Sequence, residues 1–284
     1  MTLSGMLSGA AALAGVIGWP IAHSRSPRLH GFWLRQHDID GAYLPLAIAP
    51  EKLESAVLGL RDAGFRGLNV TIPHKETVMA LCDRVDETAQ RIGAVNTLVF
   101  EGETILGSNS DAFGFIENLK AGAAGHDLTA APGLLLGAGG AARAVAVALL
   151  DAGLPELLIC NRSPERAEAL AATLGTRVKA LPWSARAEAL SDLGLLVNST
   201  SLGMSGHPPL DLPLDRLPAS ALVTDLVYTP LETPLLAAAK TRGCRVVDGL
   251  GMLLHQARPG FRAWFGVDPE VTPELRAFVL GETA

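Results

Sequence analysis

A single lysine, Lys75, stands where the sequence indicates proton transfer. It follows the extended run "NVTIPH", in a chain that has five lysines and eighteen arginines. Arginine keeps its proton in proteins, whereas lysine can release one when its surroundings are tuned. A general acid or base must exchange a proton, so lysine at this position indicates more than a need for positive charge. Asp111, in "GSNSD", is a plausible partner that would hold the ammonium group in place.

Two serines flank an arginine in the stretch "GWPIAHSRSPRLH", residues 18–30. Ser26 followed by Pro27 is typical of the start of a helix, with the serine as its N-cap. The hydroxyls of Ser24 and Ser26 beside a helix N-terminus would also bind a carboxylate or a phosphate. The stretch by itself leaves both interpretations open.

The loop "GAGGAA", residues 137–142, indicates a dinucleotide site. It fits G-x-G-x-x-[GA] with Gly137, Gly139 and Ala142, and it stands between an apolar strand and an alanine-rich helix, as the pattern requires. Gly137 allows the tight turn, Gly139 lets a pyrophosphate approach the backbone, and the helix N-terminus supplies amides and a favourable dipole. The alternative is a helix entry made of small residues for packing alone.

The end of the next predicted strand favours NADP over NAD. NAD sites usually carry Asp or Glu about 20 residues past the glycines, where it binds the ribose 2′-hydroxyl. This chain has Asn161, Arg162 and Ser163 there, with Arg166 one turn later. Guanidinium groups suit a phosphate dianion, so we expect NADP(H). Two solvated arginines at the start of a helix are the alternative.

Extended and helical patterns alternate along the chain, which is typical of α/β proteins. Strands are predicted near residues 13–17 after a short disordered lead, in "AYLPLAI", in "GLNVTIP" and in the hairpin "VNTLVFEGETILGSNSD". Helices are predicted in "PEKLESAVLGLRDAG" and over residues 75–93. From residue 132 onward, strands and helices follow one another as in a parallel sheet, and the closing segments "GMLLHQARPGFRAWFG" and "TPELRAFVLG" are predicted to be helical.

We therefore predict an α/β protein of two domains. Residues 1–111 would form a substrate-binding and catalytic domain. Residues 112–248 would form a doubly wound, Rossmann-type domain that binds the dinucleotide, and residues 249–284 would return as helices to the first domain. The active site is expected between the two domains.

Composition limits the partners and the cofactors. Of the 284 residues, 49% are hydrophobic and 18% are charged, and the net charge of −6 argues against nucleic acid or an anionic membrane as partner. No run reaches the roughly 18 to 20 apolar residues that span a bilayer, and the N-terminus lacks the basic segment of a signal peptide. The three cysteines and seven histidines are scattered. We expect a cytoplasmic protein without a metal.

Several stretches, taken in order, resemble the shikimate dehydrogenase family across nearly the whole chain. They are "GWPIAHSRSPRLH", "GLNVTIPHK", "GAVNT", "NSDAFG", "GAGGAARA", "NRS", "NSTSLGM", "DLVYTPLETPLL" and "DGLGMLLHQA". The resemblance implies the reversible reduction of 3-dehydroshikimate to shikimate with NADPH, a step toward chorismate and the aromatic amino acids. It implies a small-molecule substrate as partner and a monomer or a homodimer.

The resemblance also implies a role for individual residues. Ser24 and Ser26 match the serines that bind the substrate carboxylate, and Lys75 matches the catalytic lysine, with Asp111 as its partner. The ring hydroxyls would be held by Thr71, Asn96, Asp111 and Gln256, with Tyr228 near the carboxylate. The positions matched to the cofactor are Gly137, Ala138, Gly139, Gly140, Ala141, Asn161, Arg162, Ser163, Arg166, Leu226, Gly249 and Met252.

Departures from the family pattern are few. Gly31 stands where Asn is usual, which puts the packing of that helix in doubt, while "NSD" and "NSTS" replace "NTD" and "NATS". Two other functions stay open: a quinate/shikimate dehydrogenase that uses NAD or both cofactors, and a non-catalytic NADP-binding metabolite sensor. The presence of both Lys75 and Asp111 favours an enzyme.

Overall fold

The computed structural model describes residues 7–281 and divides the chain into two compact units. Of the described residues, unit 1 contains 7–110 and 256–281, and unit 2 contains 111–255. Helix α8, Leu250–Phe265, runs through the second boundary between the units, which therefore falls later in the chain than residues 248 and 249, where the sequence placed it. The predicted disordered lead falls mainly on residues 1–6, outside the described residues.

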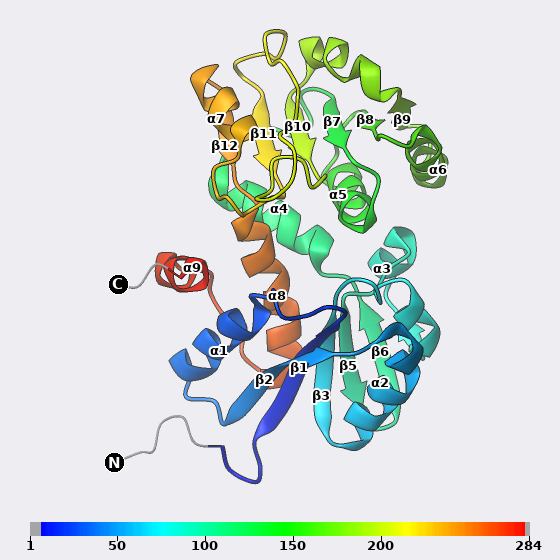
Figure 1. Cartoon of the computed structure of the whole chain (residues 1–284), viewed down its shortest axis with the longest axis vertical. Helices are drawn as coiled ribbons and strands as arrows, with labels where there is room; N and C mark the ends of the chain where they lie inside the picture. Colours follow the sequence, from blue (N-terminus) through cyan, green and yellow to red (C-terminus); the bar gives the residue numbers. More distant parts are fainter. Residues whose placement is uncertain (1–6, 282–284) are drawn as a thin grey trace. The chain divides into compact units, whose positions relative to one another are not determined.

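Unit 1 contains a six-stranded mixed sheet with the strand order β2-β1-β3-β5-β6-β4 (Figure 1). The strands are β1 Ala12–Gly18, β2 Gly41–Ala47, β3 Phe65–Val70, β4 Arg84–Val85, β5 Thr97–Glu101 and β6 Thr104–Ser108. β5 is antiparallel to both β3 and β6, whereas the other pairings are parallel. The start of β5 therefore lies at the same edge of the sheet as the ends of β1, β3 and β6.

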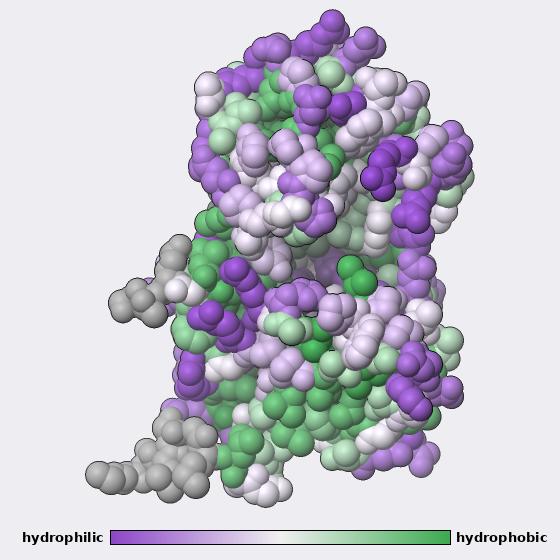
Figure 2. Space-filling view, in the orientation of Figure 1, coloured by the Kyte–Doolittle hydropathy of each residue, from purple (hydrophilic) through white to green (hydrophobic). Residues whose placement is uncertain are grey.

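The helices of unit 1 are amphipathic and turn their apolar faces inward. They are α1 Ser26–Gln36, α2 Leu53–Asp62, α3 Glu87–Ile92, α9 Pro273–Leu280 and the second part of α8. Apolar side chains from β1, β3, α2 and β5 form one core, with Ile17, Leu68, Val57 and Leu98 fully or almost fully buried. In the view of Figure 2, hydrophobic residues also reach the surface over part of this sheet, in keeping with a 39% exposed Leu44 on the edge strand β2.

The predicted helix over residues 75–93 is wrong. The segment forms a 3₁₀ turn at Thr77–Leu81, the short strand β4 and then α3. Asp83 explains the break, because its backbone N–H donates to the Ile105 carbonyl and its side chain accepts from the Ile105 N–H, at 2.9 and 2.7 Å. Asp86 then caps α3 through the Ala89 N–H. Both aspartates use hydrogen bonds that a continuous helix would not offer.

Unit 2 is a parallel, doubly wound sheet with the order β12-β11-β10-β7-β8-β9 (Figure 1). The strands are β7 Gly133–Leu136, β8 Leu157–Cys160, β9 Val178–Leu181, β10 Leu195–Asn198, β11 Leu222–Asp225 and β12 Arg245–Val247. Its helices are α4 Asp111–Gly122, α5 Gly140–Asp151, α6 Pro164–Leu174 and α7 Pro234–Thr241. The α/β class and the Rossmann-type arrangement predicted from the sequence are confirmed.

Candidate active site

The glycine loop of unit 2 is shaped by close contacts on one side and by open space on the other. Gly137 has a φ of 110°, and a Cβ added there would lie 2.5 Å from the Ser199 Oγ. A Cβ on Gly139 or Gly140 would meet nothing within 4 Å. The amino end of α5 therefore faces open space beside a turn that only glycine can make, which fits a pyrophosphate on its backbone amides.

This loop lies at the switch point of the sheet. β7 pairs with β10 on one side and with β8 on the other, so the connections of the sheet diverge from this central strand. Ligands of doubly wound sheets bind in the crevice outside the carboxyl ends of the strands at such a point. Leu226 follows β11 and donates its N–H to the Asn198 carbonyl at 2.9 Å. Gly249 follows β12, and a Cβ on it would lie 2.4 Å from the Leu226 carbonyl oxygen. The half-buried Met252 follows in the first turn of α8.

The end of β8 carries positive charge. Arg162 and Arg166 are exposed, and neither forms an ion pair among the described residues. Asn161 donates its side-chain amide to the Ser163 carbonyl at 2.9 Å, which fixes the turn into α6. No carboxylate occupies the strand end, so the turn suits a phosphate better than a ribose hydroxyl.

A buried aspartate that the sequence analysis did not select supports the next turn of unit 2. Asp225 accepts hydrogen bonds from the Val227 N–H, the Thr233 hydroxyl and the Asn198 amide, at 3.0, 2.7 and 2.9 Å. Burial raises the pKa of the Asp225 carboxyl, and these three hydrogen bonds act against that rise. The Asp225 carboxylate therefore holds in place the segment that carries Leu226 and Tyr228.

In unit 1, several predicted substrate residues gather at one edge of the sheet. The Thr71 N–H donates to the Ile17 carbonyl at 3.0 Å, which joins the ends of β3 and β1. Lys75 follows on the same segment, and its carbonyl accepts from the Val95 N–H at 2.8 Å. Asn96 immediately precedes β5 at this edge. The antiparallel β5 is therefore what brings Asn96 beside the segment that carries Lys75.

The stretch containing Ser24 and Ser26 differs from the predicted cap. Ser26 is the first residue of α1, the N-cap is Arg25, and no side chain caps the helix. The Ser24 Oγ instead accepts a hydrogen bond from the Ser26 N–H at 3.3 Å. Ser26 lies one residue past the N-cap, inside the helix, so its side chain is not at the capping position. The interpretation of Ser26 as the N-cap of the helix is therefore wrong.

The Asn96 side chain is held in one orientation. Its Oδ1 accepts from the Ser110 N–H at 2.9 Å, from the Ser110 hydroxyl at 3.1 Å and from the Thr97 hydroxyl at 2.9 Å. A backbone N–H can only donate, so the atom that faces it must be the oxygen. The Asn96 Nδ2 lies 3.4 Å from the Gln256 Oε1, which brings two of the predicted hydroxyl-binding residues together.

Behind Asn96 lies a buried hydrogen-bond chain that the sequence analysis missed. The Tyr43 hydroxyl donates to the Asn69 Oδ1 at 2.6 Å, and the Asn69 amide donates to the Asn96 carbonyl and the Thr97 hydroxyl, at 3.2 and 3.3 Å. Burial raises the pKa of Tyr43 well above its ordinary value, and a hydrogen bond from Ser26 acts in the opposite direction. An asparagine inside the strand "LNVTIP" and one of only two tyrosines were the available signals.

The sequence-predicted residues fall in both units. Ser24, Ser26, Thr71, Lys75, Asn96 and Gln256 belong to unit 1. Asp111 is the buried first residue of α4 in unit 2, and Tyr228 follows β11 there. The pairing of Lys75 with Asp111 joins two units and stays a prediction.

Family comparisons agree with one another along the chain. Residues 16–98 match the shikimate dehydrogenase substrate binding domain, residues 120–204 match shikimate / quinate 5-dehydrogenase, and residues 249–273 match the shikimate 5′-dehydrogenase C-terminal domain. A shikimate dehydrogenase (NADP(+)) of Paramagnetospirillum magneticum is 59% identical over 275 residues, covering 96% of this chain and 100% of that protein. The chain belongs to the shikimate dehydrogenase family.

Solved structures extend the comparison to ligands. The shikimate 5-dehydrogenase of Thermus thermophilus, in complex with NADP(H) and shikimate, has a TM-score of 0.85 and 41% identity, covering 96% of this chain and 100% of its own. A quinate dehydrogenase of Corynebacterium glutamicum, in complex with NAD, has a TM-score of 0.89 and 31% identity, covering 95% of this chain and 99% of its own.

Gly31, which departs from the pattern of the shikimate dehydrogenase family, lies within α1. A Cβ on Gly31 would meet nothing within 4 Å, so this position faces open space and the packing of α1 does not depend on it. In the part of the chain that the structure describes, no helix is long and apolar enough to cross a membrane, and no group of three or more His, Cys, Asp or Glu side chains could hold a metal ion.

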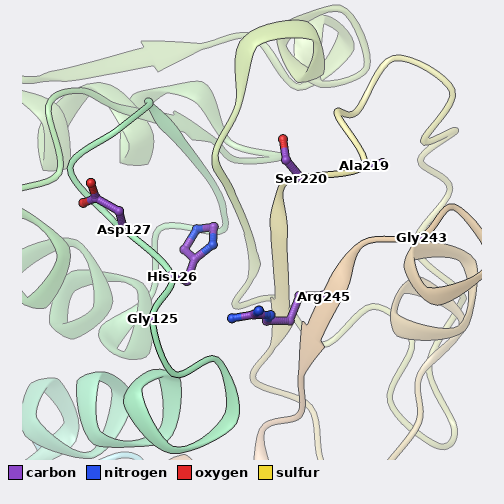
Figure 3. Close-up of a pocket in the computed structure, with 7 residues that line it drawn as sticks. All are labelled: Gly125, His126, Asp127, Ala219, Ser220, Gly243 and Arg245. Atoms are coloured by element: carbon purple, nitrogen blue, oxygen red, sulfur yellow. The ribbon is translucent and has the colours of Figure 1, made fainter.

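A hollow of about 310 Å³ opens elsewhere on unit 2, beside the amino ends of β11 and β12 (Figure 3). Two of its polar side chains are already used within the protein: Arg245 donates to the Ala124 carbonyl at 2.9 Å, and the His126 Nε2 donates to the Gly194 carbonyl at 3.1 Å. Figure 3 shows the Asp127 carboxylate directed away from Arg245. The hollow lies at the edge opposite the glycine loop, and we assign its residues to chain packing.

Proposed function

We propose that the chain catalyses the reversible reduction of 3-dehydroshikimate to shikimate with NADPH, in the biosynthesis of aromatic amino acids. The observation that carries this proposal is the edge of unit 1, where Lys75 lies on the segment joined to Asn96 and where the serines of the α1 turn follow β1. Family membership and the NADP(H) and shikimate bound to the Thermus thermophilus relative support it.

The two units would divide the work. Unit 1 would be the substrate domain, with α9 and most of α8 as its C-terminal part, and unit 2 would be the NADP domain. The glycine loop fits the pyrophosphate, while Arg162 and Arg166 would bind the 2′-phosphate. Leu226, Gly249 and Met252 would line the nicotinamide end. When bound, NADPH supplies the hydride that reaches the ketone carbon of the substrate.

The protein's own part is to position the substrate and to manage one proton. Ser24 and Ser26 would bind the carboxylate, with Tyr228 near it. Thr71, Asn96, Asp111 and Gln256 would hold the ring hydroxyls in one orientation. Asn96 can meet a hydroxyl only as a donor, because its oxygen already accepts three hydrogen bonds. Lys75 would give its proton to the alkoxide oxygen as it forms and take the proton back in the reverse direction, with Asp111 holding the ammonium group.

We also propose that the protein is located in the cytoplasm. All three cysteines, Cys82, Cys160 and Cys244, are free thiols. Burial raises the pKa of Cys82 and of Cys160 to about 11, so both stay protonated and unreactive near neutral pH. Unpaired cysteines are typical of a reducing compartment.

A quinate dehydrogenase that uses NAD is the second candidate, since one solved relative is such an enzyme. The purified protein would be assayed at the nicotinamide absorbance band with shikimate or quinate, each with NADP or NAD. The proposal expects the highest kcat/KM for shikimate with NADP. A preference for quinate with NAD would support the second candidate, and no turnover with any pair would favour a non-catalytic sensor.

A further inference from the structure

The last helix of the chain is fastened to the helix that begins beside Ser24 and Ser26. α9 starts at the Thr272 cap and ends at Gly281, whose N–H donates back to the Ala277 and Phe278 carbonyls. Its final turn therefore carries the negative end of a helix dipole, and the last carbonyls can accept hydrogen bonds from side chains outside the helix. Two arginines of the α1 region meet these carbonyls: Arg25 donates to the Val279 oxygen at 3.2 Å and Arg28 to the Phe278 oxygen at 2.9 Å.

The contact forms one stripe along α1. Arg25, Arg28, Phe32 and Arg35 are spaced by three, four and three residues, so they share a face of the helix. The Phe278 ring lies 5.4 Å from the Phe32 ring, and the guanidinium carbons of Arg28 and Arg35 each lie 5.1 Å from its centre. Both arginines thus add cation–π attraction to the same aromatic ring.

The other face of α1 is packed in the core. Leu29, His30 and Trp33 are fully buried, and the Trp33 indole donates to the Glu270 carbonyl at 3.0 Å. The first turn of α1 is therefore held between the core and α9 (Figure 1). Its backbone position depends on a segment some 250 residues away in sequence.

Arg25 stands between the two serines and serves as the N-cap residue of α1. A guanidinium in that place could bind a substrate carboxylate itself. In the structure it donates to the α9 carbonyl instead, so its charge meets the negative end of a helix dipole. Ser24 and Ser26 are the neutral side chains of this turn: the Ser24 Oγ accepts from the Ser26 N–H, and the Ser26 side chain hydrogen-bonds Tyr43.

We propose that α9 is a brace for the carboxylate-binding turn, and that Arg25, Arg28 and Phe278 are positioning residues that hold Ser24 and Ser26 ready for the substrate. The inference rests on the proposed function, because it assumes that the serines bind a carboxylate. A loosened brace would weaken shikimate binding in the ground state and the transition state alike. Its effect should therefore appear in KM and leave kcat nearly unchanged.

The test compares Arg25→Gln and Phe278→Ala with the parent protein at saturating NADP. Each variant should raise the KM for shikimate by about 5- to 10-fold, as expected for losing one modest contact, with kcat within about twofold and the KM for NADP unchanged. Arg25→Lys keeps the charge and a donor, so it should recover most of the affinity.

Arg177→Gln is the matched control. Arg177 also donates to a carbonyl in the last turn of a helix, that of Leu150 in α5 at 3.2 Å, and to the Leu154 carbonyl just after this helix at 3.1 Å, but it lies in unit 2. It should lower the melting temperature about as much as Arg25→Gln does and leave the KM for shikimate unchanged. If Arg25→Gln does not fold, Phe278→Ala and Arg28→Gln decide.

The KM values for shikimate distinguish the brace from direct binding of the carboxylate by Arg25. A raised KM in Arg25→Gln with a parental KM in Phe278→Ala would mean that Arg25 binds the carboxylate directly, and the brace would be wrong. Parental KM values in both variants would overturn it as well. A parent protein that does not oxidise shikimate would overturn the proposed function and the brace together.

Discussion

At the scale of single residues, buried polar side chains of unit 1 set what the site can offer a ligand. The chain from Tyr43 through Asn69 to Thr97 ends on the carbonyl and side chain of Asn96. Each amide orientation follows from a backbone group whose role is fixed, a carbonyl for Asn69 and an N–H for Asn96. Asn96 is therefore a pre-oriented amide, and if it binds a substrate hydroxyl as proposed, less ordering is needed on binding.

His30 gives a pH prediction at this scale. The ring is fully buried and stacked on Tyr43 at 3.9 Å, and neither ring nitrogen has a hydrogen-bond partner in the described structure. Burial lowers the pKa of His30 from 6.5 to about 3, and the Asn69 side chain, which raises it, offsets this only in part. Between these values the unfolded chain binds a proton that the folded protein does not, so stability should fall as the pH falls.

We expect the free energy of unfolding in urea to drop by about 2 kcal/mol from about pH 7 to about pH 5 through this group alone. His30→Phe keeps an aromatic ring against Tyr43 and removes the titration. The variant should therefore lose less stability over the same interval. Equal slopes for the variant and the parent protein would show that His30 does not carry the effect.

Arg162 gives a prediction on cofactor choice. Arg162→Ala removes a guanidinium from the end of β8, where no carboxylate stands. The loss of one charge-assisted phosphate contact should raise the KM for NADP roughly thirtyfold. The KM for NAD should stay nearly the same, because NAD has no phosphate at that position. Steady-state kinetics with both cofactors would check this, and equal losses would contradict the assignment.

At the scale of elements, Gly31 tests the account of α1. It lies within the helix, and an added Cβ would meet open space, so Gly31→Ala should stabilise the protein by about 0.5–1 kcal/mol. Gly251 is the control, since a Cβ there would lie 1.8 Å from the Asn118 Oδ1. Gly251→Ala should be destabilising. Urea unfolding of both variants measures the difference, and a destabilised Gly31→Ala would contradict the open position.

Periodicity predicted most elements because each has its own signal. The strands "GLLL" and "LLIC" are short apolar runs followed by turn residues, and α5 and α6 begin at the predicted places. The prediction of a helix over residues 75–93 was wrong because Asp83 and Asp86 form hydrogen bonds with β6, a strand distant in sequence. The chain through Tyr43 and Asn69 could not be predicted for the same reason, since it joins three strands.

At the scale of the whole molecule, the resemblance supplied what the residues alone did not. Glycine spacing and the arginines after β8 predicted the dinucleotide site from local chemistry. No local signal joins Asn96 and Gln256, because the return of α8 to unit 1 brings them together. The proposed pairing of Lys75 with Asp111 has no local signal either, since the two residues belong to different units.

The central claim is that Lys75 carries the proton and does more than supply positive charge. The most direct measurement is the turnover of Lys75→Arg with 3-dehydroshikimate and NADPH, beside the parent protein and Lys75→Ala. Arginine keeps the charge but cannot release a proton, so kcat should fall by about 100- to 10,000-fold in both variants while both ligands still bind. Near-parental turnover in Lys75→Arg would show that charge alone suffices and would contradict the claim.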